Sequence, residues 1–174
     1  KIRKHGMPEQ VLECLANEIA IHEVCDHPNI VRIFESFESC DHIHIALEAC
    51  EGGEVLSLLV EQGPLCEADA TLVMRQVLQA VLYLHGVKNV AHRDLKLENL
   101  LLKSRGAPLG DNTVKVIDFG FAASFTPGER SFNTPCGTPV YMAPETNVGP
   151  YDEKCDIWSC GIMSYELLSG DLTF

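Results

Sequence analysis

The sequence has few positive charges and no long apolar run. Its 174 residues carry 13 Lys and Arg against 25 Asp and Glu, a formal net charge of −12. Such an acidic chain is a poor partner for nucleic acid or an anionic membrane surface, and no apolar run is long enough to span a bilayer. Internal repeats and low-complexity tracts are also missing. With 46% hydrophobic residues, we expect a globular protein whose acidic surface either attracts basic peptides or is simply solvated.

Paired cysteines are missing too. The eight cysteines are scattered along the chain, and none form the Cys-x-x-Cys pairs typical of zinc sites. Most lie in apolar surroundings, so reduced thiols that serve as small core residues fit better than a disulfide framework. We therefore expect a cytoplasmic protein.

Hydrophobic periodicity predicts both helices and strands. The last long helix is apolar, and we expect its Trp158 to be part of the core. We expect Gly86 to end the preceding helix, predicted over residues 67–85. The predicted elements are a helix at about 8–24, a hairpin of strands 31–37 and 42–47, a glycine-containing hinge at 48–54, and helices from about 55, at 67–85 and at 156–168.

A cluster of charged residues lies between two apolar segments. Residues 90–102 read V-A-H-R-D-L-K-L-E-N-L-L-L, which predicts a strand, a tight loop and a second strand. Within this loop Asp94 could accept a hydroxyl proton, Lys96 could neutralise a moving phosphate, and Asn99 could hold a metal ion. These are the groups that phosphoryl transfer requires. The alternative is a plain charged loop.

Two tripeptides follow this loop in order. A predicted strand over 114–117 leads into Asp118-Phe119-Gly120, and Asp118 lies 24 residues after Asp94. Ala143-Pro144-Glu145 begins a further 25 residues on. Each tripeptide alone is weak evidence, but the ordered set is specific.

On these motifs the sequence resembles the eukaryotic protein kinases over essentially its whole length. The segment Tyr151–Gly161 is similar to the calcium-dependent protein kinases of the calcium/calmodulin-regulated group. Lys96 and Gly137-Thr138-Pro139 match the serine/threonine type. The resemblance implies an α+β, bilobal kinase-like fold, truncated at both ends, with an incomplete N-lobe over residues 1–48 and an incomplete C-lobe over residues 49–174.

The resemblance also implies roles at the reaction centre. Asp94 corresponds to the catalytic base and Lys96 to the phosphate clamp. Asn99 and Asp118 correspond to the residues that bind Mg²⁺.

The ATP site follows from the same resemblance. Glu18 corresponds to the helix glutamate that pairs with a strand lysine, which is Lys1 or a residue just upstream of it. Leu47 matches the gatekeeper, and the backbone of Glu48 and of Cys50 would meet the adenine edge. We also expect a contact from Glu54, either to the ribose or to a substrate arginine.

The remaining implied roles concern the substrate and regulation. Glu98 and Glu166 match positions that bind substrate arginines, although Glu166 could be a structural helix charge. Arg93 corresponds to the arginine that meets an activation-loop phosphate. Thr134 is a candidate for that phosphate, and a plain loop threonine is about equally compatible with the sequence.

These residues predict an ATP- and Mg²⁺-dependent serine/threonine kinase that acts on proteins with basic residues near the target. The alternative is a truncated or pseudokinase-type fragment that acts only as a binding module. Asp94, Asn99 and Asp118 are all present, which disfavours a pseudokinase. No calcium-binding D-x-D-x-D-G loop lies within the chain, so calcium or calmodulin control would act only through segments outside it.

Overall fold

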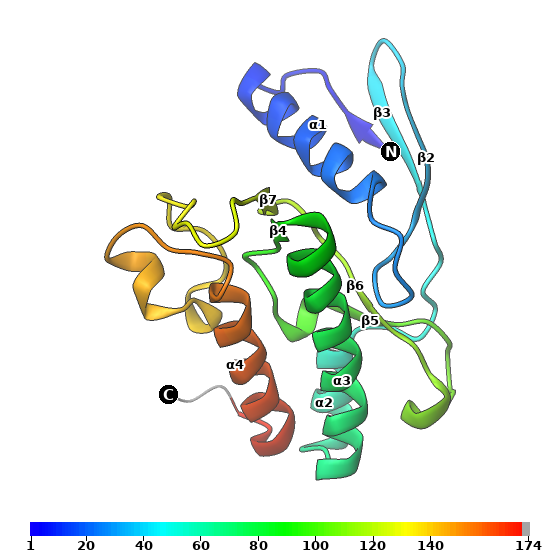
Figure 1. Ribbon diagram of the computed structural model, residues 1–174. Helices are drawn as coiled ribbons and strands as arrows, with labels where there is room; N and C mark the ends of the chain where they lie inside the picture. The colour runs from blue at the N-terminus through cyan, green and yellow to red at the C-terminus, as the bar shows by residue number, and fades with distance from the viewer. Residues whose placement is uncertain (172–174) are drawn as a thin grey trace.

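A small antiparallel sheet and one helix form the N-terminal part of the computed structural model, which describes residues 1–171 (Figure 1). The sheet has the order β1-β3-β2, built from β1 (Ile2–Arg3), β2 (Ile33–Glu38) and β3 (His42–Leu47). The predicted hairpin is confirmed, with Ile33 opposite Leu47. Helix α1 (Glu9–Glu23) lies alongside this sheet.

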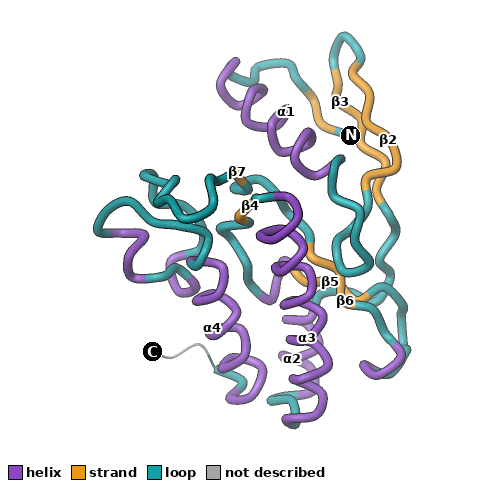
Figure 2. Tube along the Cα trace, viewed as in Figure 1, coloured by secondary structure: helices purple, strands orange, loops and turns teal. Residues whose placement is uncertain are grey.

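Three helices dominate the rest of the chain. They are α2 (Val55–Gln62), α3 (Glu67–Tyr83) and α4 (Cys155–Ser169), and α3 packs against α4 (Figure 2). The predicted apolar stripe of α3 is confirmed, because its members are at most 2% exposed: Val73, Val77, Ala80, Val81 and Leu84. Burial of such a stripe supplies most of the stability of a helix in a protein.

Two short strand pairs lie between these helices and hold the loops that carry the charged motifs. Strand β4 (Val90–Ala91) pairs with β7 (Ala123–Ser124), and β5 (Leu100–Leu102) pairs with β6 (Val114–Val116), both antiparallel. Short 3₁₀ turns lie between these strands at Leu97–Asn99 and Leu109–Asp111, and between β7 and α4 at Pro139–Tyr141 and Pro144–Asn147. The predicted strand–loop–strand arrangement of residues 90–102 is therefore confirmed.

The end of α3 differs from the prediction. The α-helix stops at Tyr83, and a π-helical turn at Leu84–Lys88 continues through Gly86. Asn89 closes this turn with φ 52°, a left-handed conformation that asparagine tolerates better than most residues. The wider turn keeps Leu84 fully buried and still brings His85 within 2.8 Å of a carboxylate on α4.

Trp158 was expected in the core, and this prediction is wrong. The side chain is 46% exposed, on the side of α4 opposite Cys160 and Met163. The helix is apolar on more than one side, so its hydropathy did not identify the face that packs against α3. Within residues 1–171, no helix combines the length and apolarity that a membrane span requires.

Candidate active site

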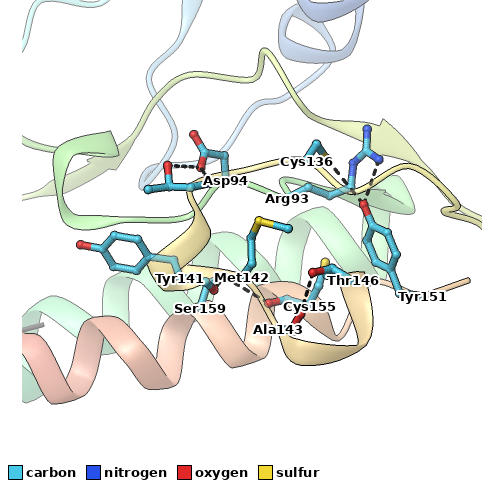
Figure 3. A pocket seen from close by; sticks show the side chains of 11 residues that line it. Arg93, Asp94, Cys136, Tyr141, Met142, Ala143, Thr146, Tyr151, Cys155 and Ser159 are labelled. Carbon is cyan, nitrogen blue, oxygen red and sulfur yellow. Dashed lines mark hydrogen bonds between the residues drawn. The ribbon is translucent and has the colours of Figure 1, made fainter. Parts of the chain in front are cut away.

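Asp94 lies at the centre of the charged loop and is 5% exposed. Its Oδ1 accepts hydrogen bonds from the backbone N–H and the hydroxyl of Thr138, both at 2.8 Å (Figure 3). Its Oδ2 lies 3.1 Å from the ammonium of Lys96. A carboxylate held on both oxygens keeps a single orientation, which is what a group that aims a hydroxyl needs.

Lys96 and Asn99 complete this cluster. The Lys96 ammonium donates to the Thr138 hydroxyl at 2.8 Å, so Thr138 bridges the lysine and Asp94. The amide nitrogen of Asn99 donates to the backbone carbonyl of Asp94 at 2.9 Å. From the sequence, Thr138 was identified only as part of a motif that matches the serine/threonine type. Its bridging position depends on a contact across 44 residues.

A buried aspartate on α4 supports the backbone of the charged loop. Asp156 is fully buried and accepts from the backbone N–H groups of His92 and Arg93, each at 2.8 Å. His85, from the π-helical turn, also lies 2.8 Å from this carboxylate. Charge-assisted bonds of this kind are among the strongest in proteins. Sequence reasoning missed Asp156, because an aspartate in the first turn of a helix ordinarily reads as a favourable end charge.

Phe119 anchors the second motif. Its fully buried ring stacks on His22 of α1 with a centroid distance of 4.3 Å and lies 5.1 Å from the ring of His92. Asp118, just before it, adopts a left-handed φ of 63°, and its Oδ1 accepts from the backbone N–H of Gly120 at 3.2 Å. The motif is thus fixed both to α1 and to the charged loop.

A cavity of about 350 Å³ lies between the N-terminal sheet and these motifs. Its lining includes Glu18 and His22 from α1, Leu47 and Glu48 at the end of the sheet, and Asp118. Leu47 is 50% exposed, so a large apolar side chain faces open space. Burial and the nearby charge of Asp118 raise the pKa of Glu18. A cation between these two carboxylates would remove that repulsion.

Lys1 is the residue predicted to pair with Glu18. It immediately precedes β1, and burial together with the charges of Lys1 and His42 lowers the pKa of His44. In the described part of the chain no ion pair involves Lys1. The pairing of Lys1 with Glu18 stays a prediction.

The predicted hinge begins with an ion-paired glutamate. Glu48 Oε2 lies 2.7 Å from the Lys115 ammonium, and Oε1 lies 3.0 Å from that of Lys103. Burial opposes ionisation of Glu48, but hydrogen bonds from these lysines lower its pKa overall. Cys50 is partly buried, and burial raises the pKa of its thiol. Glu54 immediately precedes α2 and forms an isolated bridge with the strand β5.

Glu98 and Glu166 are brought together, although they lie far apart in the sequence. The Tyr141 hydroxyl donates to Glu166 Oε2 at 2.6 Å and lies 3.5 Å from Glu98 Oε2. Glu166 is only 3% exposed, and burial raises its pKa, with a further contribution from Glu98. Within residues 1–171, Glu54 forms no hydrogen bond or ion pair with either carboxylate. Sequence reasoning missed Tyr141, whose role depends on this convergence.

Arg93, within the charged loop, and Thr134 both contact the Tyr151 hydroxyl. Arg93 Nε donates to the carbonyl of Phe121 at 2.7 Å, and its guanidinium lies 4.7 Å from the centre of the Phe132 ring. The side chain of Thr134 is exposed, and its carbonyl accepts from the Tyr151 hydroxyl at 2.9 Å.

The fold and this cluster define a protein kinase domain, and the chain belongs to the protein kinase family, whose domain it matches over residues 1–174. Among curated relatives, it is 38% identical to calcium-dependent protein kinase 3 of Plasmodium yoelii yoelii over 153 residues, which cover 88% of this chain and 28% of the relative. It is 40% identical to calcium-dependent protein kinase 5 of Plasmodium falciparum, over 91% of this chain and 27% of the relative.

A third relative comes from another lineage. The chain is 42% identical to a probable myosin light chain kinase of Dictyostelium discoideum, over 92% of this chain and 50% of the relative. The chain thus spans about a quarter to a half of the length of these relatives. The comparisons confirm the predicted resemblance to serine/threonine kinases and to calcium-dependent protein kinases.

Proposed function

We propose that this protein transfers the γ-phosphoryl group of Mg²⁺-ATP to serine or threonine hydroxyls of protein substrates. The observation that supports this most directly is the cluster of Asp94, Lys96 and Thr138 within hydrogen-bonding distance of one another. Asp118 lines a cavity of about 350 Å³, which is large enough for part of a nucleotide. Membership of the protein kinase family supports the same conclusion.

In this proposal each residue of the cluster has a separate task. Asp94 accepts a hydrogen bond from the substrate hydroxyl and aims its oxygen at the phosphorus. Lys96 stabilises negative charge on the phosphoryl group as it moves, because its ammonium is already held by Asp94 and Thr138. Thr138 keeps both side chains in register. The backbone of Glu48 and Cys50 meets the adenine edge, and Leu47 bounds the cavity behind it.

The donor set fits Mg²⁺. Carboxylate and amide oxygens are the ligands that this ion prefers, and Asp118 and Asn99 provide one of each. The Asn99 amide nitrogen is used by Asp94, so the amide oxygen is the atom left for a metal. A bound cation would also relieve the repulsion between Glu18 and Asp118, which contributes to the raised pKa of Glu18. When bound, Mg²⁺ neutralises charge on the phosphates of ATP.

We propose further that substrates carry arginine or lysine on the N-terminal side of the target residue. Glu98 and Glu166 converge around the Tyr141 hydroxyl, which gives two carboxylates at one place. Paired carboxylates can grip a guanidinium in a bidentate manner, which a lysine cannot match. Glu54 stays a candidate for the ribose or for such an arginine. Two relatives are named as calcium-dependent, and we propose that any such control of this chain acts through segments outside it.

A peptide array with labelled ATP tests both proposals. We expect Mg²⁺-dependent labelling of serine and threonine peptides, several-fold stronger when arginine precedes the target. Glu98→Gln should reduce that preference, whereas Glu61→Gln on the exposed side of α2 serves as the matched control. Labelling that does not depend on Asp94 or on Mg²⁺ would contradict the kinase assignment. Equal labelling with and without arginine would contradict only the substrate preference.

A further inference from the structure

One buried side chain, Tyr151, joins the activation segment (residues 118–145) to Arg93. Tyr151 is 1% exposed, and its hydroxyl donates to the Thr134 carbonyl at 2.9 Å. The same hydroxyl accepts from Arg93 Nη1 at 3.4 Å and lies 3.6 Å from the Cys136 sulfur (Figure 3). Three segments that are distant in the sequence therefore meet at one oxygen atom.

The backbone and ring of Tyr151 hold the same segment. Its N–H donates to the Phe132 carbonyl at 2.9 Å, and the Phe132 N–H donates back at 3.1 Å. The two rings pack with centroids 5.4 Å apart, and Phe132 in turn lies under the Arg93 guanidinium. Burial and the Cys136 thiol raise the pKa of Tyr151 to about 12, so the hydroxyl remains a donor at neutral pH.

The activation segment continues from these contacts to the reaction centre. Gly137 has φ 102°, and a Cβ atom built there would lie 2.5 Å from the Arg93 carbonyl oxygen, so the segment passes directly against that backbone. The next residue is Thr138, which holds Asp94. Only three residues separate Thr134 from Thr138, so a displacement at Thr134 is transmitted to the position of Thr138.

We propose that Tyr151 is a positioning residue that holds the activation segment in place while Thr134 is unmodified. A phosphate on an activation segment orders it by pairing with arginine. Here Arg93 is already engaged by the Phe121 carbonyl, the Phe132 ring and the Tyr151 hydroxyl. The exposed side chain of Thr134 takes no part in these contacts. Phosphorylation of Thr134 is therefore not required for the ordered arrangement. The inference rests on the proposed kinase activity only for its catalytic readout.

Limited proteolysis of the full chain tests the proposal without an activity assay. Arg130 is the only Lys or Arg in residues 119–150, so trypsin has one site in the segment. We expect Tyr151→Phe to speed cleavage after Arg130 about tenfold, the effect of losing a hydrogen bond of ordinary strength. Cleavage after the exposed Arg105 is the internal control. Tyr83→Phe is the matched variant, since it removes a hydroxyl that accepts from Asp26 N–H at 2.9 Å, away from the segment.

A rescue experiment separates positioning from simple packing. In Tyr151→Phe the Arg93 guanidinium loses the Tyr151 hydroxyl as a partner. The carboxylate introduced by the second substitution, Thr134→Glu, can take the place of that hydroxyl. We expect the double variant to regain slow cleavage after Arg130, whereas lost core packing would not be restored. Unchanged cleavage in Tyr151→Phe, or no recovery in the double variant, would overturn the proposal.

Turnover of a serine peptide gives an independent readout. We expect Tyr151→Phe to lower kcat about tenfold with KM for ATP unchanged, and Thr134→Ala to leave kcat unchanged. A fall in kcat for Thr134→Ala as large as that for Tyr151→Phe would contradict the inference. If the unmodified chain shows no turnover, the proposed function fails, and proteolysis still decides the role of Tyr151.

Discussion

Single side chains in this protein owe their orientation to partners that lie far away in the sequence. Asp94 is held by Thr138, 44 residues on, and the loop that carries it is held by Asp156, 62 residues on. Asn99 and Asp118 differ, since the Asn99 amide reaches back only five residues to Asp94 and Asp118 accepts from Gly120 two residues on. The chemistry at the site therefore depends on residue types within one loop, and their geometry depends on contacts from outside it.

Substitution of the two acidic residues of the site should separate catalysis from nucleotide binding. Asp94→Asn keeps the hydrogen bonds near Thr138 but removes the proton acceptor, so we expect kcat to fall by about 10²- to 10⁴-fold with nucleotide affinity nearly unchanged. Asp118→Asn removes a charged metal ligand, so Mg²⁺-dependent turnover should be lost. Steady-state kinetics and titration with a fluorescent nucleotide measure both. The exposed Asp111→Asn is the control, and unchanged turnover in Asp118→Asn would contradict the assigned role.

At the scale of secondary-structure elements, α3 and α1 differ in how many of their residues are buried. Helix α3 is the central core helix, with a continuous buried stripe that packs against α4 and β6. Helix α1 has only one buried residue, His22, so it is attached to the rest of the molecule mainly through its last turn. There His22 contacts the Val31 carbonyl through Nε2 and stacks on Phe119.

Two leucines, Leu82 in the last turn of α3 and Leu84 in the π-helical turn that follows it, provide a matched test of the buried face. Leu84 is fully buried, so Leu84→Ala should lower the free energy of unfolding by about 2–5 kcal/mol. Leu82 is 72% exposed, so Leu82→Ala should change it by less than about 0.5 kcal/mol. Urea denaturation followed by circular dichroism measures both. Similar values for the two variants would show that the buried face is assigned wrongly.

His22 should make stability depend on pH. Burial lowers its pKa, which the bond to Val31 partly offsets and His92 reinforces. Since the pKa is lower in the folded state, this contribution is present above about pH 6.5 and is lost as the pH falls toward the folded value. We expect unfolding free energy to decrease less between pH 7 and pH 5 in His22→Leu than in the unmodified chain. Parallel pH profiles for the two proteins would contradict this.

At the scale of the whole molecule, charge and exposed apolar surface are the dominant features. The net charge is −12, and we expect its long-range field to favour the approach of basic peptides. Two open apolar grooves also lie on the helical part, one of about 740 Å³ beside Trp158 and Ile157, and one of about 500 Å³ beside Leu78 and Leu82. The division into an N-lobe over 1–48 and a C-lobe over 49–174 stays a prediction.

Salt should weaken the attraction for basic peptides. Screening shortens the reach of surface charges from about 10 Å at 0.1 M to about 3 Å at 1 M ionic strength. We expect kcat/KM for an arginine-containing peptide to fall several-fold between 0.05 and 0.5 M NaCl. A peptide of the same length without basic residues is the control and should change little. Equal salt dependence for both peptides would show that the field of the protein does not contribute.

The sequence by itself determined which chemistry is available and most of the elements that carry it. The motifs around Asp94 and Asp118 are local, because each needs only a few adjacent residues after a strand. The buried stripe of α3 and the hairpin were also predicted, since periodicity of 3.6 or 2 residues is a local property. The predicted resemblance to protein kinases depended on the order and spacing of such motifs.

Only the tertiary structure decided which residues converge. Asp156, Tyr141 and Tyr151 support the site through contacts that span 17 to 64 residues, and no local pattern marks them. The exposed position of Trp158 was likewise decided by packing, because α4 is apolar on more than one side and α3 covers only one of them. Hydropathy records what a side chain prefers, and the fold determines which of several equivalent faces is buried.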